Sequence, residues 1–302
     1  MNSSKVCIVT GASRGLGRGI ALVLAREAGC RVYATARNEE GLNSLVKEAA
    51  EGNKGGTVIA CKLDQSDDAA VHTFVEEVKE QESQVDLLVN SAYGGLLAIK
   101  SHFGKPFWER PIAVFDASLN IGLRSAYVMS ALVAPVMVKN KAGLIVQISS
   151  FGGVNYLFDV GYGVGKAGLD RLTTDMAVEF KPYGVHAVTL YPGGAVTEIA
   201  AFPDGETPVF TGRAVAALLN TATKEDLELM NGKVVQTVEL AVEYGFTDIT
   251  GEMPKGPFSN IDAAKQCRET MSKPLTQYDR DAELADSMMT NNPDMAAMFP
   301  GA

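Results

Sequence analysis

The sequence predicts an α/β fold with a doubly wound parallel sheet in a single domain, and three observations support this prediction. Short apolar runs alternate with longer amphipathic segments, as in proteins whose parallel strands are joined by helices. The apolar runs are rich in Val, Ile and Leu, which is typical of strands covered by helices on both faces. No internal repeat or low-complexity linker interrupts residues 5–195 of the 302-residue chain.

The expected elements follow one another in the order β, α, β, α, β, α, β in the first part of the chain. These strands are expected at 5–11, 30–37, 56–64 and 85–92, with helices that end near residues 28, 51 and 82. Further on, a strand at 143–150, a helix at 160–183 and a strand at 184–194 bring the sheet to at least six strands. Ligands of such sheets bind at the carboxyl ends of the strands, so functional residues are expected there.

The pattern weakens from Glu198 onward. The segment IAAFPDGETPVFTG is rich in Pro, Gly and polar residues, which suits either a substrate loop over about 198–230 or an ordinary surface excursion. We expect the domain to span 1–254. Residues 255–302 form a C-terminal tail that is expected to be partly disordered or to pack as an arm on another subunit.

The composition excludes several classes of function. Lys plus Arg minus Asp plus Glu is 27 − 36 = −9, which argues against binding to nucleic acid. The four cysteines and three histidines show no metal-ligating spacing, so no metal is expected. No run of about 18 apolar residues and no leader pattern is found, so we expect a cytoplasmic protein without an integral membrane segment. Peripheral association with an organelle stays open.

The turn after the first strand, TGASRGLG, opens a helix. Its glycines let the chain turn sharply and let backbone N–H groups approach a pyrophosphate at the positive end of that helix. A glycine-rich turn alone is weak evidence, and the preceding strand and following helix strengthen it. The residues expected to contact a dinucleotide here are Gly11, Ser13, Arg14, Gly15, Leu16 and Gly17.

The end of the second strand indicates which dinucleotide is bound. Ala36 and Arg37 stand where NAD-binding proteins commonly offer Asp or Glu to the adenosine ribose. Arg37, together with Arg14, is suited to a 2′-phosphate, which favours NADP(H) over NAD(H). The alternative is that both arginines are solvated surface charges. Asp64, Asn90 and Ala92 end the third and fourth strands, where adenine and ribose would lie, although lone polar residues there also form turns.

Tyr162 and Lys166, in YGVGK, are spaced as neighbours on one helix face. With TGASRGLG, Asp64, NSA at 90–92, ISS at 148–150 and PGGAVT at 192–197, they resemble the short-chain dehydrogenase/reductase family over roughly residues 5–198. In order and spacing this set of motifs is highly specific. The resemblance implies a Rossmann-type fold and carbonyl reduction by a nicotinamide cofactor.

The resemblance also implies roles for single residues. Tyr162 is expected to protonate the carbonyl oxygen, and Lys166 to lower the pKa of Tyr162 and to hydrogen-bond the nicotinamide ribose. Ser150, rather than its neighbour Ser149, is expected to hold that oxygen, because a glycine follows it at the family's usual spacing. The segment after the last strand is expected to contact the nicotinamide carboxamide through Pro192, Gly193, Ala195 and Thr197.

The expected substrate is a small or medium apolar ketone, aldehyde, quinone or steroid-like carbonyl. An alternative is a sensor or scaffold that binds NADP(H) with little or no turnover. The family's usual assembly implies a homodimer or homotetramer, for which the apolar stripe SAYVMSALVAPVMV suits an interface; the same stripe also suits a core.

Three departures from the family pattern concern the site. Tyr93 stands where the family's NNAG has glycine, placing a ring near the cofactor. Gly122 aligns with the family's helix asparagine, whereas Asn120 lies about 200° further around the helix and is assigned no role. The insertion SHFGKPFWERP brings Phe103, Phe107 and Trp108, either as a substrate wall or as packing under a loop.

Overall fold

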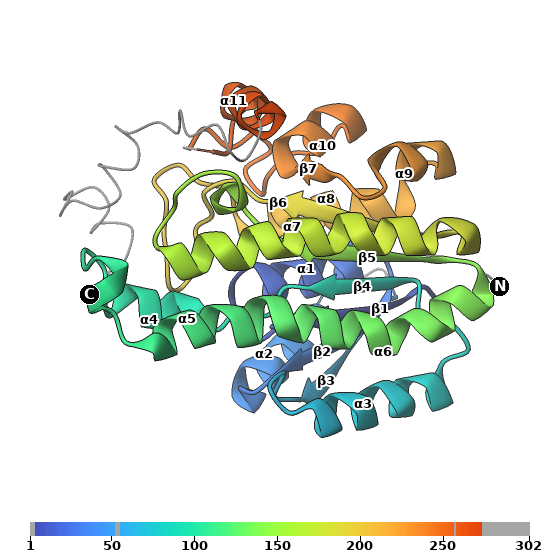
Figure 1. The fold of residues 1–302 in the computed structure, drawn as a ribbon. Coiled ribbons are helices and arrows are strands. Elements are labelled where there is room, and N and C mark those ends of the chain that lie inside the picture. Colours follow the sequence, from blue (N-terminus) through green and yellow to red (C-terminus); the bar gives the residue numbers. More distant parts are fainter. Residues whose placement is uncertain (1–3, 52–54, 257, 274–302) are drawn as a thin grey trace.

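Seven parallel strands form one sheet in the order β3-β2-β1-β4-β5-β6-β7 (Figure 1). The computed structural model describes residues 4–51, 55–256 and 258–273. The strands are β1 (Val6–Thr10), β2 (Arg31–Ala36), β3 (Thr57–Lys62), β4 (Leu87–Asn90), β5 (Gly143–Ile148), β6 (Val185–Tyr191) and β7 (Val234–Gln236). The order reverses between β1 and β4, which is the switch point where ligands of such sheets bind.

Helices cover both faces of the sheet (Figure 1). One face is packed by α1 (Gly15–Arg26), α2 (Glu39–Ala50) and α8 (Pro208–Asn220). The other face is packed by α3 (Asp68–Gln81), α6 (Ser125–Asn140) and α7 (Val160–Phe180). The remaining α-helices are α4 (Gly95–Lys100), α5 (Ile112–Ser118), α9 (Lys224–Met230), α10 (Thr237–Tyr244) and α11 (Ile261–Ser272). The predicted doubly wound fold is confirmed.

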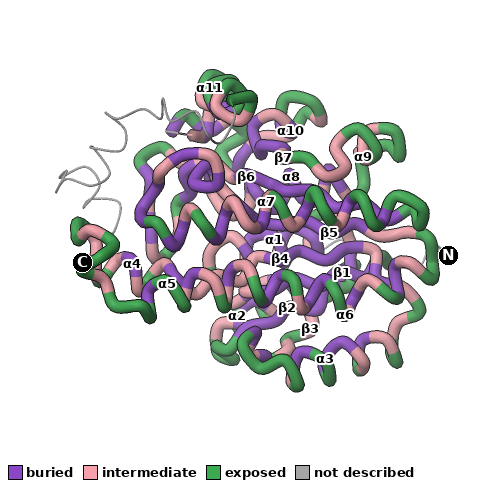
Figure 2. Tube along the Cα trace, viewed as in Figure 1, coloured by how far each residue is buried: buried purple, intermediate pink, exposed green. Residues whose placement is uncertain are grey.

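The sheet separates two apolar cores, because successive side chains of a strand point to opposite faces. In β1, Cys7 and Val9 contact the core under α1, whereas Val6 and Ile8 contact the core under α3 and α6. Figure 2 shows the strands as the buried centre of the molecule. This two-sided burial explains why most of the strands are apolar at nearly every position, whereas the edge strand β3 is partly exposed.

The chain after residue 198 contains more regular structure than the sequence predicted. The expected substrate loop is irregular only up to Thr207, where α8 begins with Pro208 in its first turn. The strand β7 has three residues, too few to show a period. The first part of the tail forms α11, which buries Ala264 and Cys267 against the domain. The expectation of disorder or an arm for residues 274–302 lies outside the described residues.

The stretch Ile112–Asn140 is the one described helical segment long and apolar enough, by length and composition, to cross a membrane, and 44% of its most apolar window is buried. It consists of α5, the π-helical segment η2 (Leu119–Arg124) and α6. Met129, Val133 and Met137 on α6 are fully buried against the sheet. The buried residues of the stripe SAYVMSALVAPVMV therefore belong to the core of the domain.

Candidate active site

A cavity of about 420 Å³ opens at the carboxyl ends of the strands, beside the switch point between β1 and β4. It extends from the glycine turn after β1 to the first turns of α7. Sixteen of the seventeen residues predicted to act or to bind the cofactor line it: Gly11, Ser13, Arg14, Gly15, Leu16, Gly17, Arg37, Asp64, Ala92, Ser150, Tyr162, Lys166, Pro192, Gly193, Ala195 and Thr197.

Asn90 departs from the prediction, because it does not line the cavity. Its side-chain amide donates to Ser130 Oγ at 3.0 Å and to the Ala126 carbonyl at 3.4 Å, both on α6. The buried Asn90 therefore braces the end of β4 against α6. Polar residues at strand ends satisfy buried hydrogen-bonding groups as readily as they bind ligands.

The glycine turn allows a close approach of backbone segments. Gly11 has a φ of 70°, and a Cβ added there would lie 2.7 Å from the Cα of Ala92. A Cβ on Gly17 would lie 2.5 Å from the carbonyl oxygen of Gly11. A larger side chain at either position would fill the cradle at the start of α1, so these glycines fit a dinucleotide-binding turn.

The start of α1 also contacts an acidic side chain that the sequence analysis missed. The Gly15 N–H donates to Glu198 Oε2 at 2.9 Å. A helix N-terminus favours negative charge, so the carboxylate occupies the kind of position that a phosphate would take. Glu198 directly follows Thr197 of the predicted cofactor segment, and only the folded chain brings it to a turn that lies 183 residues away.

Arg37 lies at the far end of the cavity beside Asp64. The closest guanidinium and carboxylate atoms are 3.9 Å apart, and the Arg37 side chain is 70% exposed. Hydrogen bonds from Ser66 hold the pKa of Asp64 below its usual value, with a smaller contribution from Arg37. An exposed pair of this kind is weak, so Arg37 can exchange it for another anion at little cost.

The local structure of α7 sets the positions of Tyr162 and Lys166. Asp159 caps the helix by accepting the Tyr162 N–H at 2.6 Å. One turn further on, Lys166 Nζ donates to the Ile148 carbonyl at the end of β5 at 2.9 Å. The cap and this hydrogen bond hold both side chains on the buried face of α7.

The two adjacent serines after β5 point to different partners. The Ser150 hydroxyl hydrogen-bonds the Tyr162 phenol, which lowers the pKa of that phenol, and Ser150 Oγ also accepts the Gly152 N–H at 3.1 Å. Ser149 Oγ instead donates to the Lys166 carbonyl at 3.2 Å. The structure therefore brings Ser150, Tyr162 and Lys166 together, while their catalytic roles stay predictions.

The electrostatic expectation for Tyr162 needs a correction. Burial raises the pKa of Tyr162 to about 12, and the Ser150 hydrogen bond only partly offsets this. Burial likewise lowers the pKa of Lys166 to about 8. Lys166 Nζ lies 5.6 Å from the centroid of the Tyr162 ring. Loss of hydration thus outweighs the attraction that was expected to lower the tyrosine pKa.

Two buried carboxyl groups form hydrogen bonds next to the residues that line the cavity, and the sequence analysis missed both. Asp170 lies one helical turn after Lys166 and accepts the hydroxyl of Tyr191; burial raises the Asp170 pKa to about 7. Glu206 is fully buried and accepts the Gly193 N–H at 2.9 Å. Asp170 follows Lys166 by four residues on a helix, so the sequence could have placed it next to Lys166. Glu206 stands in an irregular segment, where no periodicity indicates its position.

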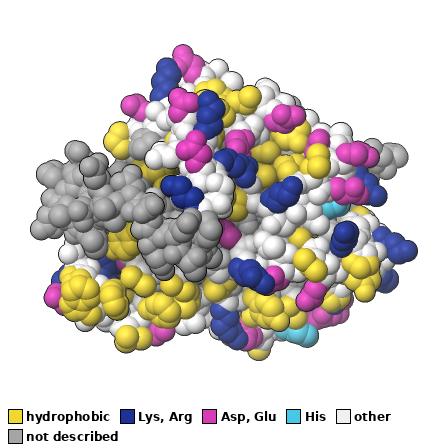
Figure 3. All heavy atoms as spheres, turned by 45° about the horizontal axis from the view of Figure 1, so that its top comes forward, with side chains coloured by type: hydrophobic (Ala, Val, Ile, Leu, Met, Phe, Trp, Pro, Cys, Tyr) yellow, Lys and Arg dark blue, Asp and Glu magenta, His cyan; other side chains and the backbone are white. Residues whose placement is uncertain are grey.

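The aromatic insertion does not form a wall of the cavity. Phe103 packs in an apolar cluster with Ile99 and Tyr162. Phe107 and Trp108 contact each other with ring centroids 5.4 Å apart and are 60% and 72% exposed. Figure 3 shows hydrophobic side chains on the side of the molecule where α4 and α5 lie. The apolar lining comes from other residues: Leu96, Leu97, Ile121, Phe158, Ile199 and Phe202.

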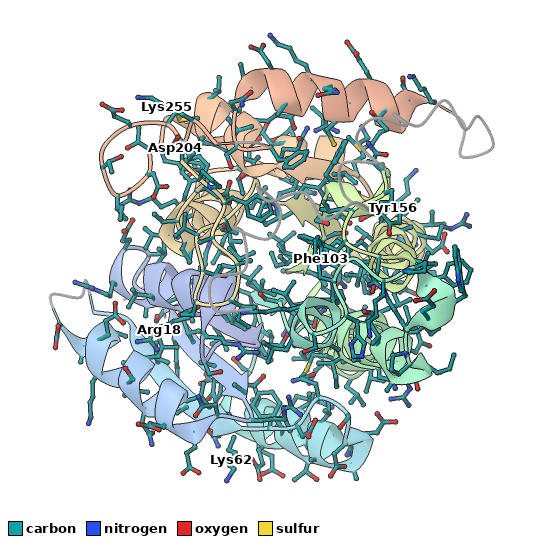
Figure 4. The ribbon with its side chains drawn as sticks, turned by 90° about the vertical axis from the view of Figure 1, so that its left-hand side faces the viewer. Arg18, Lys62, Phe103, Tyr156, Asp204 and Lys255 are labelled. Atoms are coloured by element: carbon teal, nitrogen blue, oxygen red, sulfur yellow. The ribbon has the colours of Figure 1, made fainter. Side chains whose placement is uncertain are left out.

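Figure 4 views the molecule from the side where α4, α5 and the start of α7 lie. Arg18 and Lys62 mark the β1–β3 half, and Phe103 and Tyr156 mark the half formed by α4, α5 and α7. Asp204 lies across from Tyr156, on the segment after β6. The glycine turn follows β1, whereas the catalytic candidates follow β5 or lie on α7, and all of them line the same cavity.

Comparisons with known proteins agree with this arrangement. The family model for short chain dehydrogenase matches residues 5–204. "Dehydrogenase/reductase SDR family member 1" of Mus musculus is 40% identical over 276 residues, which cover 84% of this chain and 86% of the mouse protein.

Two solved structures are similar in fold. A metagenomic short-chain oxidoreductase in complex with NADP has a TM-score of 0.64 and 29% identity, covering 77% of this chain and 96% of that one. A 7α-hydroxysteroid dehydrogenase complexed with NADH and 7-oxo glycochenodeoxycholic acid has a TM-score of 0.66 and 26% identity, covering 77% and 92%.

Proposed function

The chain belongs to the short-chain dehydrogenase family, and from this premise we propose that it catalyses the NADPH-dependent reduction of a small or medium apolar carbonyl to the alcohol. The observation that carries the proposal is the meeting of Ser150, Tyr162 and Lys166 in one cavity with the glycine turn. The substrate is a ketone, aldehyde, quinone or steroid-like carbonyl.

The side chains divide the work as follows. A bound nicotinamide cofactor supplies hydride. The Tyr162 hydroxyl donates a proton to the carbonyl oxygen, and Ser150 Oγ hydrogen-bonds the same oxygen as negative charge develops on it. The Lys166 ammonium stabilises the phenolate that remains after proton transfer. Because Tyr162 and Lys166 are buried, this attraction is screened little by water.

The lining of the substrate side supports an apolar substrate. Leu96, Ile121, Phe158 and Phe202 contribute apolar surface, and Lys166 is the one charged residue among the cavity-lining residues of α4, η2 and α7. Apolar pockets with a few placed polar groups are typical of sites for small organic ligands. The related 7α-hydroxysteroid dehydrogenase, complexed with an oxo bile acid, supports the inclusion of steroid-like carbonyls.

The function is tested by incubating the purified protein with NADPH or NADH and a panel of aliphatic ketones, aldehydes, quinones and oxosteroids. We expect the absorbance of the reduced nicotinamide to fall with at least one carbonyl class, and faster with NADPH. Tight binding of NADPH without oxidation across the panel would instead identify a sensor or scaffold.

Cofactor preference depends on Arg37 in this proposal. An Arg37→Asp variant is expected to shift the ratio of NADPH to NADH affinity toward NADH by about 10-fold or more, because it replaces a charged hydrogen-bond donor with a repelling carboxylate. Dissociation constants from fluorescence titration measure this ratio.

The matched control for Arg37 is Lys62→Asp. Lys62 ends the neighbouring strand β3, pairs with Glu39 at 3.2 Å and does not line the cavity. It undergoes the same change of charge nearby and is expected to keep the wild-type ratio. An equal shift in both variants would show a general field effect rather than a contact with the 2′-phosphate.

Glu198 is expected to compete with the pyrophosphate for the start of α1. Glu198→Ala removes a carboxylate from the Gly15 N–H and should tighten NADPH binding by about 3-fold or more. Adenosine 2′-monophosphate, which has no pyrophosphate, should bind wild type and variant alike in the same titration. Unchanged or weaker NADPH binding by the variant would contradict this competition.

The proposal includes a cytoplasmic homodimer or homotetramer. Tyr127 on α6 and Val164 and Val178 on α7 are exposed by 59%, 47% and 70%, which supports an apolar contact between subunits along these helices. Light scattering coupled to size-exclusion chromatography measures the assembly, and a monomer at micromolar concentration would contradict it.

A further inference from the structure

Tyr93 contacts both residues that are expected to carry the chemistry, Tyr162 and Lys166. It follows β4, and its ring meets the Tyr162 ring at 89° with centroids 5.6 Å apart. Lys166 Nζ lies over the Tyr93 ring at 5.0 Å from its centroid, nearer than its 5.6 Å to the centroid of Tyr162. One aromatic ring therefore contacts both members of the catalytic pair.

A recess built from small residues holds this ring. A Cβ on Gly122 would lie 3.0 Å from Tyr93 Cδ2 and 3.2 Å from Cε2, so any larger residue would push the ring away. A Cβ on Gly95 would collide with Tyr93 Oη and Ser118 Oγ. The buried Ser118 hydroxyl lies 2.9 Å from Tyr93 Oη and donates to the Val114 carbonyl, so it accepts from the tyrosine.

The recess lies at an irregular point of the long helix. Gly122 belongs to the π-helical segment η2, and Asn120 in the same segment is exposed and does not line the cavity. Single π-helical turns inside α-helices are frequent at functional sites. Gly122 and Tyr93 thus form a complementary pair, in which the ring fills the space that a side chain at 122 would take.

We propose that Tyr93 is a positioning residue of the catalytic pair, whose ring face holds the Lys166 ammonium and whose perpendicular contact fixes the Tyr162 ring. The inference rests on the proposed reductase function. A cation over an aromatic face is attracted by the negative charge density of the ring, most strongly away from water. Lys166 is 7% exposed, so this attraction replaces part of its lost hydration.

Other groups around Lys166 act together with the ring. Asp170 on α7 raises the pKa of Lys166 against the larger lowering by burial, and Tyr191 of β6 donates to Asp170. Asp159, at the start of α7, is paired with Arg110. From β5, the Ile148 carbonyl accepts from Nζ. Removal of the ring would leave Asp170 as the main group that favours the ammonium.

The test compares Tyr93→Leu with Tyr93→Phe. Reduction requires the ammonium, so kcat/KM falls as pH rises through the pKa of Lys166, which burial lowers to about 8. Tyr93→Leu removes the ring, favours the neutral amine and should move this alkaline limb down by about 0.5 to 1.5 pH units. Tyr93→Phe keeps the ring and should restore the wild-type position of the limb.

Two results overturn the proposal. In the first, kcat/KM of Tyr93→Leu falls at the same alkaline pH as that of wild type. In the second, the fall of kcat/KM in Tyr93→Phe is shifted in pH as far as in Tyr93→Leu. If circular dichroism shows that Tyr93→Leu does not fold, Gly122→Ala decides in its place. Its methyl group displaces the ring, so a lowered limb supports the proposal and an unmoved limb overturns it. Wild-type turnover that is lost in Tyr162→Phe establishes the reductase function independently of these outcomes.

Discussion

Replacement of Tyr162 with phenylalanine is expected to lower kcat for carbonyl reduction by about 10² to 10⁴-fold, the usual contribution of a positioned general acid. The variant loses only the phenolic oxygen. Its ring still packs at 5.0 Å from Phe158 and 5.6 Å from Tyr93, so the fold and the binding of NADPH should be retained. Stopped-flow single turnover measures the chemical step, and fluorescence titration measures the binding.

The matched control is Tyr156→Phe. Tyr156 packs against the same apolar cluster as Tyr162, but it does not line the cavity (Figure 4). The same atom is removed from a neighbouring ring, so turnover should stay close to wild type. Near-normal turnover in Tyr162→Phe, or an equal loss in Tyr156→Phe, would mean that another group delivers the proton.

The parts of the fold that could be predicted are those with a strong local signal. The strands β1, β2, β4, β5 and β6 are buried at nearly every position because helices cover both of their faces, and the glycine turn is visible because backbone segments meet there without room for a Cβ. The strand β7 has three residues, and its pairing with β6 is set by tertiary contacts. Local sequence therefore predicted six strands of the sheet but not the edge strand β7.

The candidate site divides in the same way. The spacing of Tyr162 and Lys166 is local, so one helix face could be predicted from the sequence. The contact of Glu198 with Gly15 and that of Glu206 with Gly193 depend on how distant segments fold together. The direction of the Tyr162 pKa also escaped prediction, because the degree of burial is a property of the folded chain.

The insertion after α4 reaches the site through a buried ion pair rather than through its aromatic rings. Arg110 donates to Asp159 Oδ2 at 2.8 Å, and the two side chains are 7% and 4% exposed. Arg110 also donates to the carbonyls of Lys105 and Phe158. The other oxygen of Asp159 caps α7 through the Tyr162 N–H, so the insertion fixes the start of α7.

We expect Arg110→Met to lower the free energy of unfolding by about 3–5 kcal/mol, because it leaves the Asp159 carboxylate buried without its partner. Chemical denaturation measures this loss. In the double variant Arg110→Met/Asp159→Asn the amide oxygen can still cap α7 and the charge is gone, so most of the stability should return.

If the double variant were as unstable as Arg110→Met, the lost packing of the guanidinium, and not the unpaired charge, would be the cause. Arg171→Met gives the surface reference: its partner is Asp175, the two side chains are 77% and 54% exposed, and a loss below about 1 kcal/mol is expected. The difference between the losses of unfolding free energy in Arg110→Met and Arg171→Met measures how much burial increases the cost of losing one partner of an ion pair.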